Sequence, residues 1–459
     1  MAANENPTGA PDFDVEVFQN RYLPLGGTEV HAVATVTATG AAPGTASGAA
    51  AGVGTGLAAE VILVDTSGSM DFPSSKLSSA KLATKAAIDS LREGTLFAVV
   101  AGTGMASMVY PTDERLVPLD AHTRREAKRA VDRLRARGGT AMGQWLLAAR
   151  RLLEPYPQAI RHAILLTDGK DESETAADLT EAIERCQGVF TCDCRGVGTD
   201  WVVAELRQVA SGLLGSLSMV ADPADLIADF TEVIENAMGK AVADVSLRVR
   251  TPGSARVKFV KQVMPSIEDL THRRTDSGTN IGDYPTGSWG AETRDYHICL
   301  EVEPGDLNDP VRVGVLSLVA RGADGTETEL VREGVFAEWT DDLDLFTRVN
   351  PKVQESTGVT EMSQQIQEGL EARREGDVDL ATAKLRRALD LAEESGDEYT
   401  AKLIKNVVVE DPVTGTLKLR SDVSAAHEME LDTESVKTYR LRKTSAGTGA
   451  GARNPDSHG

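Results

Sequence analysis

The side chains with the clearest capacity for chemistry are one carboxylate and two hydroxyls that follow a short apolar run. The run is 61–64 (VILV), and Asp65, Ser67 and Ser69 come after it at alternate positions. A continuous apolar run predicts a strand that is covered on both faces. Carboxylate and hydroxyl oxygens are hard donors, which favour Mg²⁺, Mn²⁺ or Ca²⁺ over zinc. The chemistry that these residues could support is therefore the binding of a hard divalent cation.

Two further polar residues lie at comparable places later in the chain. Thr140 lies in a glycine-flanked turn before a helical pattern (RGGTAMG), and Asp168 ends a second apolar run (ILLTDG). In doubly wound sheets, ligands bind at the carboxyl ends of strands where the winding reverses. If the strands that end at Asp65 and Asp168 are neighbours, all five side chains meet in one cleft.

These positions resemble the metal-ion-dependent adhesion site of von Willebrand factor A domains, which is also found in integrin I domains. Asp65, Ser67 and Ser69 match the D-x-S-x-S motif of that site. Thr140 and Asp168 match its two later elements in order and approximate spacing. The resemblance is to a cytosolic bacterial member of the family.

The resemblance covers residues 58–240, including 196–200 (GVGTD), and implies how the five side chains act. It implies that the three hydroxyls bind the ion directly, while the two aspartates act through waters or orient the hydroxyls. Two carboxylates only just offset a divalent charge, so the ion retains affinity for one more oxygen. The expected ion is Mg²⁺, with Mn²⁺ or Ca²⁺ as alternatives, and the expected sixth ligand is an Asp or Glu carboxylate of a partner protein.

Other interpretations of the polar residues stay open at this point. Ser67 and Ser69 could only cap the following helix and Asp168 another, although capping requires neither Thr140 nor paired aspartates at strand ends. The acidic run 168–174 (DGKDESE) is either a second cation site or a solvated loop, and the loop is the favoured interpretation.

Alternating strand and helix patterns must position these residues. Six apolar runs within 58–240 predict strands, with helical patterns between them. This alternation predicts an α/β fold with a doubly wound, mostly parallel, six-stranded sheet. The Gly/Ala-rich stretch 39–57 before it predicts a flexible linker, because a dinucleotide-binding loop would follow its strand.

The flanking segments predict further domains. Residues 241–340 have strand and turn patterns without helical signal, which predicts a β-sandwich. The alternating strands within 14–38 would be marginal alone, so we expect them to join that sandwich, with the α/β domain inserted between the two parts. Residues 341–406 predict a helical hairpin similar to a tetratricopeptide unit, and 407–459 an irregular, partly disordered tail.

Composition limits the classes of partner. The chain has 459 residues and a net charge of −22, and only 4% of its residues are aromatic, which disfavours nucleic acid and anionic membranes as partners. The N-terminus shows no secretory signal pattern, and no run is long and apolar enough to span a membrane, so a cytoplasmic protein is expected. Cys192 and Cys194 match no zinc-ligand spacing and are expected to be small core residues.

The sequence predicts a binding protein, not an enzyme. P-loop, G-x-S-x-G and H-E-x-x-H motifs are missing, and His162, which precedes a buried run, is expected to be structural. The leading hypothesis is a divalent-cation-dependent protein-binding module. One alternative, implied by the family, is a component of a stress-response or tellurite-resistance system with MoxR-type ATPases or with kinases, phosphatases and phosphothreonine readers. For that system, Thr433 and Thr438, which are expected to be exposed in a polar tail, would be phosphorylation targets. The other alternative is a scaffold that the metal only stabilises.

Overall fold

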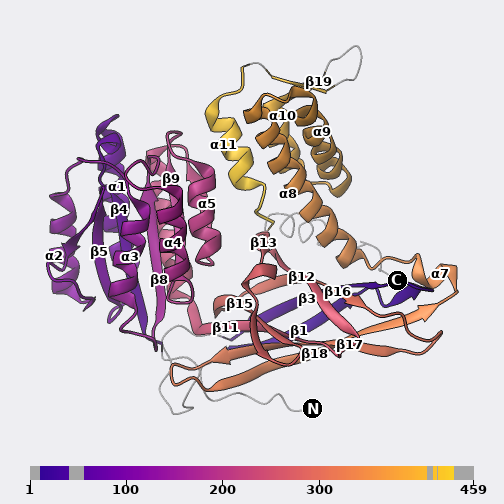
Figure 1. The fold of residues 1–459 in the computed structure, drawn as a ribbon. Coiled ribbons are helices and arrows are strands. Elements are labelled where there is room, and N and C mark those ends of the chain that lie inside the picture. Colours follow the sequence, from indigo (N-terminus) through magenta and orange to yellow (C-terminus); the bar gives the residue numbers. More distant parts are fainter. Residues whose placement is uncertain (1–10, 41–55, 411–416, 421, 439–459) are drawn as a thin grey trace, which may run out of the picture.

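The computed structural model describes residues 11–40, 56–410, 417–420 and 422–438 (Figure 1). These residues form an α/β domain, a β-sandwich and a C-terminal helical unit. Most of the expected linker 39–57 and the end of the expected tail, from 439 onward, lie outside the described residues. Every helix in the described part of the chain is too short or too polar to cross a lipid bilayer.

The α/β domain is built on a mostly parallel sheet, which confirms the predicted fold class. Its strand order is β10-β9-β8-β4-β5-β6, and the antiparallel pairs are those that β5 makes with β6 and β7. The two-residue β7 is a seventh strand that was not expected from the sequence. The strands are β4 (Ala58–Asp65), β5 (Leu96–Gly102), β6 (Ala106–Tyr110), β7 (Val117–Pro118), β8 (Ile160–Thr167), β9 (Thr191–Val197) and β10 (Leu217–Val220).

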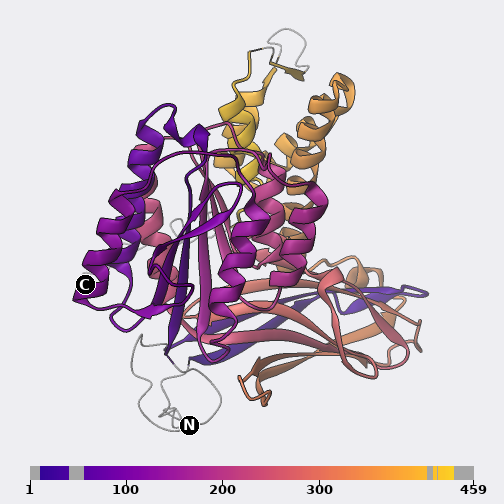
Figure 2. The ribbon, with the colours of Figure 1, turned by 60° about the vertical axis from the view of Figure 1, so that its left-hand side comes forward.

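Helices cover both faces of this sheet (Figures 1 and 2). Val61 and Leu63 of β4 pack under α3, α4 and α5, whereas Ile62 and Val64 pack under α1, α2 and α6. The uniformly apolar sequence of β4 follows from this double coverage. The helices are α1 (Ser75–Ser90), α2 (Ala121–Asp132), α3 (Met142–Leu153), α4 (Ala176–Cys186), α5 (Val203–Gly212) and α6 (Leu226–Met238).

Two further sheets enclose a second core. One has the order β1-β3-β16-β12-β13 and the other β14-β15-β11-β17-β18-β2. β3 pairs antiparallel with both β1 and β16, so strands that precede the α/β domain lie in a sheet with strands that follow it. The strands are β1 (Asp12–Gln19), β2 (Tyr22–Pro24), β3 (Glu29–Thr39), β11 (Lys240–Arg250), β12 (Ala255–Met264), β13 (Glu268–Asp269), β14 (Thr275–Gly278), β15 (Ile281–Gly290), β16 (Thr293–Val302), β17 (Val311–Arg321) and β18 (Glu327–Thr340).

The C-terminal unit has more regular structure than the sequence predicts. The prediction of an irregular segment from residue 407 is wrong for the strands β19 and β20 and for helix α11. Leu431 of α11 is fully buried in a core with residues of α8, α9 and α10, so tertiary packing stabilises a helix that lacks a clear amphipathic pattern. The elements are α7 (Leu343–Phe346), α8 (Pro351–Glu375), α9 (Val378–Ser395), α10 (Glu398–Val407), β19 (Val408–Glu410), β20 (Leu417–Leu419) and α11 (Ala425–Glu434).

The two threonines expected to be exposed in this tail are buried, so that expectation is wrong. The Thr433 hydroxyl donates to the Met429 carbonyl, and the Thr438 hydroxyl donates to the Val263 carbonyl, both at 2.6 Å. Neither hydroxyl is accessible to a kinase in this conformation.

Helix α11 and the residues after it join the other parts of the molecule. Asp432 of α11 accepts hydrogen bonds from Arg207 of α5 at 2.6 Å and from Arg374 of α8 at 3.1 Å. The Thr438 amide donates to the Pro265 carbonyl of the sandwich at 2.9 Å. Figure 1 shows α11 beside α5 and α8. This segment therefore connects the α/β domain, the helical unit and the sandwich.

Replacing Asp432 by alanine should weaken that connection. The Asp432 side chain is 7% exposed, but Arg374 is half exposed, so we expect the free energy of unfolding to fall by about 2 kcal/mol, less than for a fully buried pair. Urea unfolding measures this change. The control is Glu393→Ala, which removes an exposed ion pair with Lys405 and should cost less than about 0.5 kcal/mol. Equal losses in the two variants would contradict the prediction.

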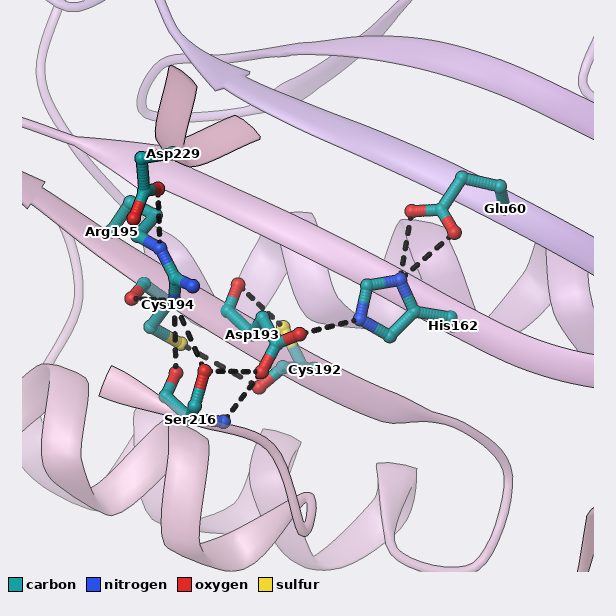
Figure 3. A network of polar contacts seen from close by, with 8 residues as sticks. All are labelled: Glu60, His162, Cys192, Asp193, Cys194, Arg195, Ser216 and Asp229. Atoms are coloured by element: carbon teal, nitrogen blue, oxygen red, sulfur yellow. Dashed lines mark hydrogen bonds and ion pairs between the residues drawn. The ribbon is translucent and has the colours of Figure 1, made fainter. Parts of the chain in front are cut away.

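A buried charged network lies near the amino ends of β4, β8 and β9 (Figure 3). His162 of β8 lies between Glu60 and Asp193, with Nδ1 at 2.8 Å from Glu60 Oε2 and Nε2 at 3.0 Å from Asp193 Oδ2. Asp193 also accepts hydrogen bonds from the amide and hydroxyl of Ser216, each at 2.6 Å. Because both ring nitrogens face carboxylates, both must donate, and the ring is an imidazolium.

Candidate metal centre

The five candidate residues lie at the opposite end of the same strands. β4 pairs with β8 on one side and with β5 on the other, all in parallel, so the winding of the sheet reverses at β4 and β8. Asp65 is the last residue of β4, and Asp168 directly follows β8. The strands that end at these aspartates are therefore neighbours at the switch point, where ligands bind in folds of this class.

Backbone hydrogen bonds join the loops at this edge. The Gly68 amide donates to the Gly138 carbonyl at 2.9 Å, and the Arg137 amide donates to the Thr66 carbonyl at 2.7 Å. These bonds tie the loop that carries the serines to the loop that carries Thr140. Main-chain contacts thus fix the relative positions of the candidate ligands before any ion binds.

The three hydroxyls and Asp168 meet beside Gly169. The Ser67 and Ser69 hydroxyl oxygens are 2.9 Å apart, and the Ser69 hydroxyl donates to Asp168 Oδ1 at 2.6 Å. A Cβ atom added at Gly169 would lie 3.2 Å from Ser69 Oγ and 3.6 Å from Thr140 Oγ1. Both hydroxyls therefore face the Gly169 backbone, and glycine keeps the space between them open.

Asp65 is fully buried, and its carboxylate accepts hydrogen bonds from the loop after β4 and from the end of β8. Its Oδ1 accepts from the Ser67 amide at 2.7 Å, and its Oδ2 accepts from the Thr167 hydroxyl at 2.5 Å. Burial raises the pKa of Asp65 to about 6, although the bonds from Ser67 and Thr167 lower it in part. Asp65 is therefore positioned to orient the loop that carries Ser67 and Ser69. The sequence did not identify Thr167 as a hydrogen-bond donor to Asp65.

Lys76 is the principal residue at this centre that the sequence interpretation missed. It lies on α1 with a side chain that is 7% exposed, and its ammonium donates to Asp168 Oδ2 at 2.7 Å and to Asp200 Oδ2 at 2.9 Å. Burial opposes the charge on Lys76, but the bonds to Asp168 and Asp200 outweigh it and raise the pKa. A detectable signal was present, because Lys76 shares the apolar face of the helix with Ala80 and Ala83 at helical spacing.

The acidic run 168–174 is not simply a solvated loop, so the favoured interpretation is wrong for Asp171 and Glu174 as well as for the buried Asp168. At the start of α3, the Met142 amide donates a hydrogen bond to Asp171 Oδ2 at 3.1 Å, and the Gly143 amide donates one to Glu174 Oε1. Carboxylates at a helix N-terminus satisfy amides that have no partner within the helix and interact favourably with the helix dipole. Burial, and then the nearby Glu174, raise the pKa of Asp171 to about 8. These residues fix the helix that directly follows Thr140.

The donors at the centre fit a hard cation. The side chains that meet around Gly169 offer hydroxyl and carboxylate oxygens, which are the donors preferred by Mg²⁺ and Ca²⁺. The Lys76 ammonium offsets one of the two buried carboxylate charges. A divalent ion would therefore be less fully neutralised here than the two aspartates alone suggest.

Comparisons with known proteins agree with the fold and extend to part of the C-terminal unit. The family model described as von Willebrand factor type A domain matches residues 59–219, and the model described as von Willebrand factor type A C-terminal domain matches residues 390–435. The second match includes α10 and α11, and α11 lies in the region that the sequence interpretation treated as irregular.

Similar structures and one similar sequence were also found. The structure of a von Willebrand factor type A protein from Catenulispora acidiphila is 49% identical, with a TM-score of 0.89, and the match covers 95% of this chain and 99% of that chain. The crystal structure of the ArnB paralog VWA2 from Sulfolobus acidocaldarius is 14% identical over 93% of this chain and all of that chain, with a TM-score of 0.56, which shows a shared fold. The uncharacterized protein sll0103 from Synechocystis is 26% identical over 215 residues, 46% of this chain. The chain spans about half the length of that curated relative.

Proposed function

Because this chain belongs to the von Willebrand factor A family, we propose that it is a divalent-cation-dependent protein-binding module. Its ion would lie among Asp65, Ser67, Ser69, Thr140 and Asp168. The observation that supports this proposal is the meeting of hydroxyls and buried carboxylates at the switch point of the sheet. The family has metal-dependent roles in protein interaction, and the donor chemistry of this chain fits such a role.

In this proposal the hydroxyls hold the ion and the aspartates orient them. Ser67, Ser69 and Thr140 supply neutral oxygens, so Mg²⁺ is the expected ion, with Mn²⁺ or Ca²⁺ as alternatives. The bound ion supplies an electrophilic position for a carboxylate of a partner protein. Lys76 contributes by neutralising part of the charge on Asp168, which leaves the ion with a stronger attraction for an external Asp or Glu.

The proposal includes no catalytic step, and the carboxylates at the centre have a positioning role in it. Asp65 accepts from Ser67 and Thr167, and Asp168 accepts from Ser69 and Lys76. A general base must lie within hydrogen-bond reach of the proton that it removes, whereas in this proposal both carboxylates orient the hydroxyls that hold the ion. Binding is therefore the activity that these described residues support best.

Affinity capture from an extract of the source organism tests this function. The full-length protein should retain a partner in Mg²⁺ and release it in EDTA, because the ion forms the contact. Asp65→Ala and the double variant Ser67→Ala/Ser69→Ala should lose both capture and calorimetric Mg²⁺ binding, with circular dichroism near that of the wild type. Ser78→Ala is the matched control, because its exposed hydroxyl on α1 donates only to the Ser74 carbonyl.

The alternatives predict different outcomes. A scaffold that the ion only stabilises would show a higher Tm in Mg²⁺ but unchanged capture in EDTA, and that result would overturn the proposal. The alternative of a phosphorylation-linked stress-response component has lost its main support in the structure. Both candidate hydroxyls, on Thr433 and Thr438, are buried and donate to carbonyls.

A further inference from the structure

A second cluster of metal-binding side chains lies on the outer face of the sandwich. β3 and β16 are antiparallel neighbours, and His31 lies directly opposite Cys299 in their register. Val30 and Ala32 of β3 point into the sandwich core, so Glu29 and His31 point to the other face. The alternation on β16 likewise turns Cys299 and His297 to that face, where both are buried while Glu29 is exposed. Four side chains with metal-binding capacity therefore lie together, far from the centre on β4 and β8.

The distances within this cluster suit a tetrahedral ion. His31 Nε2 is 3.8 Å from Cys299 Sγ and 3.7 Å from Glu29 Oε2. The three potential ligand atoms all lie within 4.8 Å of one another. For zinc, with bonds of about 2.3 Å to sulfur and about 2.0–2.2 Å to nitrogen and oxygen, tetrahedral angles separate the ligand atoms by roughly 3.3–3.6 Å. Shifts of a few tenths of an ångström at the two His31 contacts, and of up to roughly 1.2 Å between Cys299 and Glu29, would close the cluster on an ion.

His297 orients His31 in the way that metal-binding histidines are usually oriented. His31 Nδ1 is 3.1 Å from His297 Nε2, which is hydrogen-bond distance. His297 Nε2 can therefore accept a hydrogen bond from His31 Nδ1. When His31 donates from Nδ1, its Nε2 lone pair faces Cys299 and Glu29, as a ligand requires.

We propose that Glu29, His31 and Cys299 bind Zn²⁺ or a similar borderline divalent cation, with a fourth position open to water or an external ligand. Nitrogen and sulfur donors select zinc over magnesium, so this site is distinct in chemistry from the oxygen-only centre of the α/β domain. The open position is typical of sites with three protein ligands.

Ion binding changes the protonation of Cys299 and leaves the ion pair between Lys258 and Glu29 in place. The thiol proton of Cys299 leaves to water as the sulfur–metal bond forms, because thiolate is the ligand form. Lys258 donates to Glu29 Oε1 at 2.6 Å, and Glu29 Oε2 is the oxygen that faces His31. One carboxylate can therefore keep its ion pair with Lys258 and bind the metal through its other oxygen.

Titration of the full-length protein with Co²⁺ tests the site, because cobalt replaces zinc and reports its ligands. A thiolate–cobalt charge-transfer band with strong visible bands of tetrahedral cobalt should appear in the wild type and in Ser67→Ala/Ser69→Ala. The band should be absent in Cys299→Ser, and His31→Ala should weaken cobalt binding at least tenfold. His122→Ala, which changes an exposed histidine of α2, should leave the spectrum unchanged.

Zinc should displace the cobalt signal and raise the Tm of the wild type but not that of His31→Ala. A wild type without a thiolate band, or a band that persists in Cys299→Ser, would overturn the proposal. If Cys299→Ser fails to fold, Glu29→Gln decides, because loss of a charged ligand must weaken binding even though the side chain keeps its shape. If Glu29, His31 and Cys299 bind no metal, Mg²⁺ binding at the α/β centre is still expected. The experiments therefore distinguish failure of this proposal from failure of the proposed function.

Discussion

The variant Lys76→Met should be markedly less stable in EDTA than in Mg²⁺. Removing the ammonium leaves Asp168 fully buried without its cation, and breaking such a pair costs about 3 kcal/mol or more. For domains of this size that loss corresponds to a decrease of roughly 6–12 °C in Tm. A divalent ion at the centre supplies the missing positive charge. Saturating Mg²⁺ should therefore restore at least half of the loss, and the variant should bind Mg²⁺ more tightly than the wild type.

A matched substitution on the same helix controls for the loss of a lysine. Lys85 of α1 pairs with the exposed Asp132 at 2.7 Å, so Lys85→Met should cost less than about 1 kcal/mol, with the same Mg²⁺ response as the wild type. Thermal unfolding of the three proteins in EDTA and in Mg²⁺ provides the comparison. An equal loss for Lys76→Met in both buffers would show that Lys76 only stabilises the fold and that no ion takes its place.

The core strands of the α/β domain were predictable because their signal is local. The run at 61–64 is apolar throughout, and the structure shows its residues alternating between two buried faces. Asp65 and Asp168 were recognised because each directly follows such a run. A strand end can be located from its own residues, and parallel strands bring their carboxyl ends to one edge of a sheet.

The polar partners of those residues were not predictable in the same way. Thr167, Lys76 and Asp200 each contact the centre from a different segment, and only the folded register places them there. A lysine on an otherwise apolar helix face indicates a buried ion pair but does not identify its acceptor. The cluster of His31 and Cys299 has the same origin, because its two strands are separated in sequence by the whole α/β domain.

The C-terminal helix shows a different limit of prediction. The residues of α11 lack a clear apolar stripe because they contact several surfaces at once, including α5, α8 and the core of the helical unit. Most of the stability of a short helix comes from tertiary packing rather than from intrinsic propensity. A polar sequence can therefore fold into an ordered helix when its charged residues have fixed partners, as Asp432 has in Arg207 and Arg374.

The substitution His162→Leu should lower the free energy of unfolding by about 3–5 kcal/mol at pH 7, because it leaves Glu60 buried without a cation. Burial opposes the charge on His162, but Glu60 and Asp193 outweigh it and raise the pKa of His162 to about 10. The same measurement on His122→Leu, which changes an exposed histidine, should give a loss below about 0.5 kcal/mol.

The pH dependence of stability reports this charge directly. The pKa of histidine in the unfolded chain is about 6.5, so the stabilisation is fully present below that pH and is lost as the pH rises through about 10. Between those values the wild type should lose about 1.4 kcal/mol per pH unit relative to Glu60→Leu/His162→Leu, a reference without the Glu60 carboxyl group, whose own pKa burial raises. Urea unfolding of both proteins between pH 6 and 10 measures the difference, and parallel curves would show that His162 is neutral in the folded protein.

A double variant shows how much of the lost free energy of unfolding comes from leaving one charge unpaired and how much comes from losing the network of ion pairs. Replacing a buried ion pair by apolar residues of similar volume is often neutral, whereas removing one partner is not. Glu60→Leu/His162→Leu should therefore recover at least half of the stability that His162→Leu loses, since Asp193 keeps its two bonds from Ser216. Losses that add in the double variant would mean that Glu60 and His162 each stabilise the sheet independently, and the interpretation of an ion pair that spans β4 and β8 would be wrong.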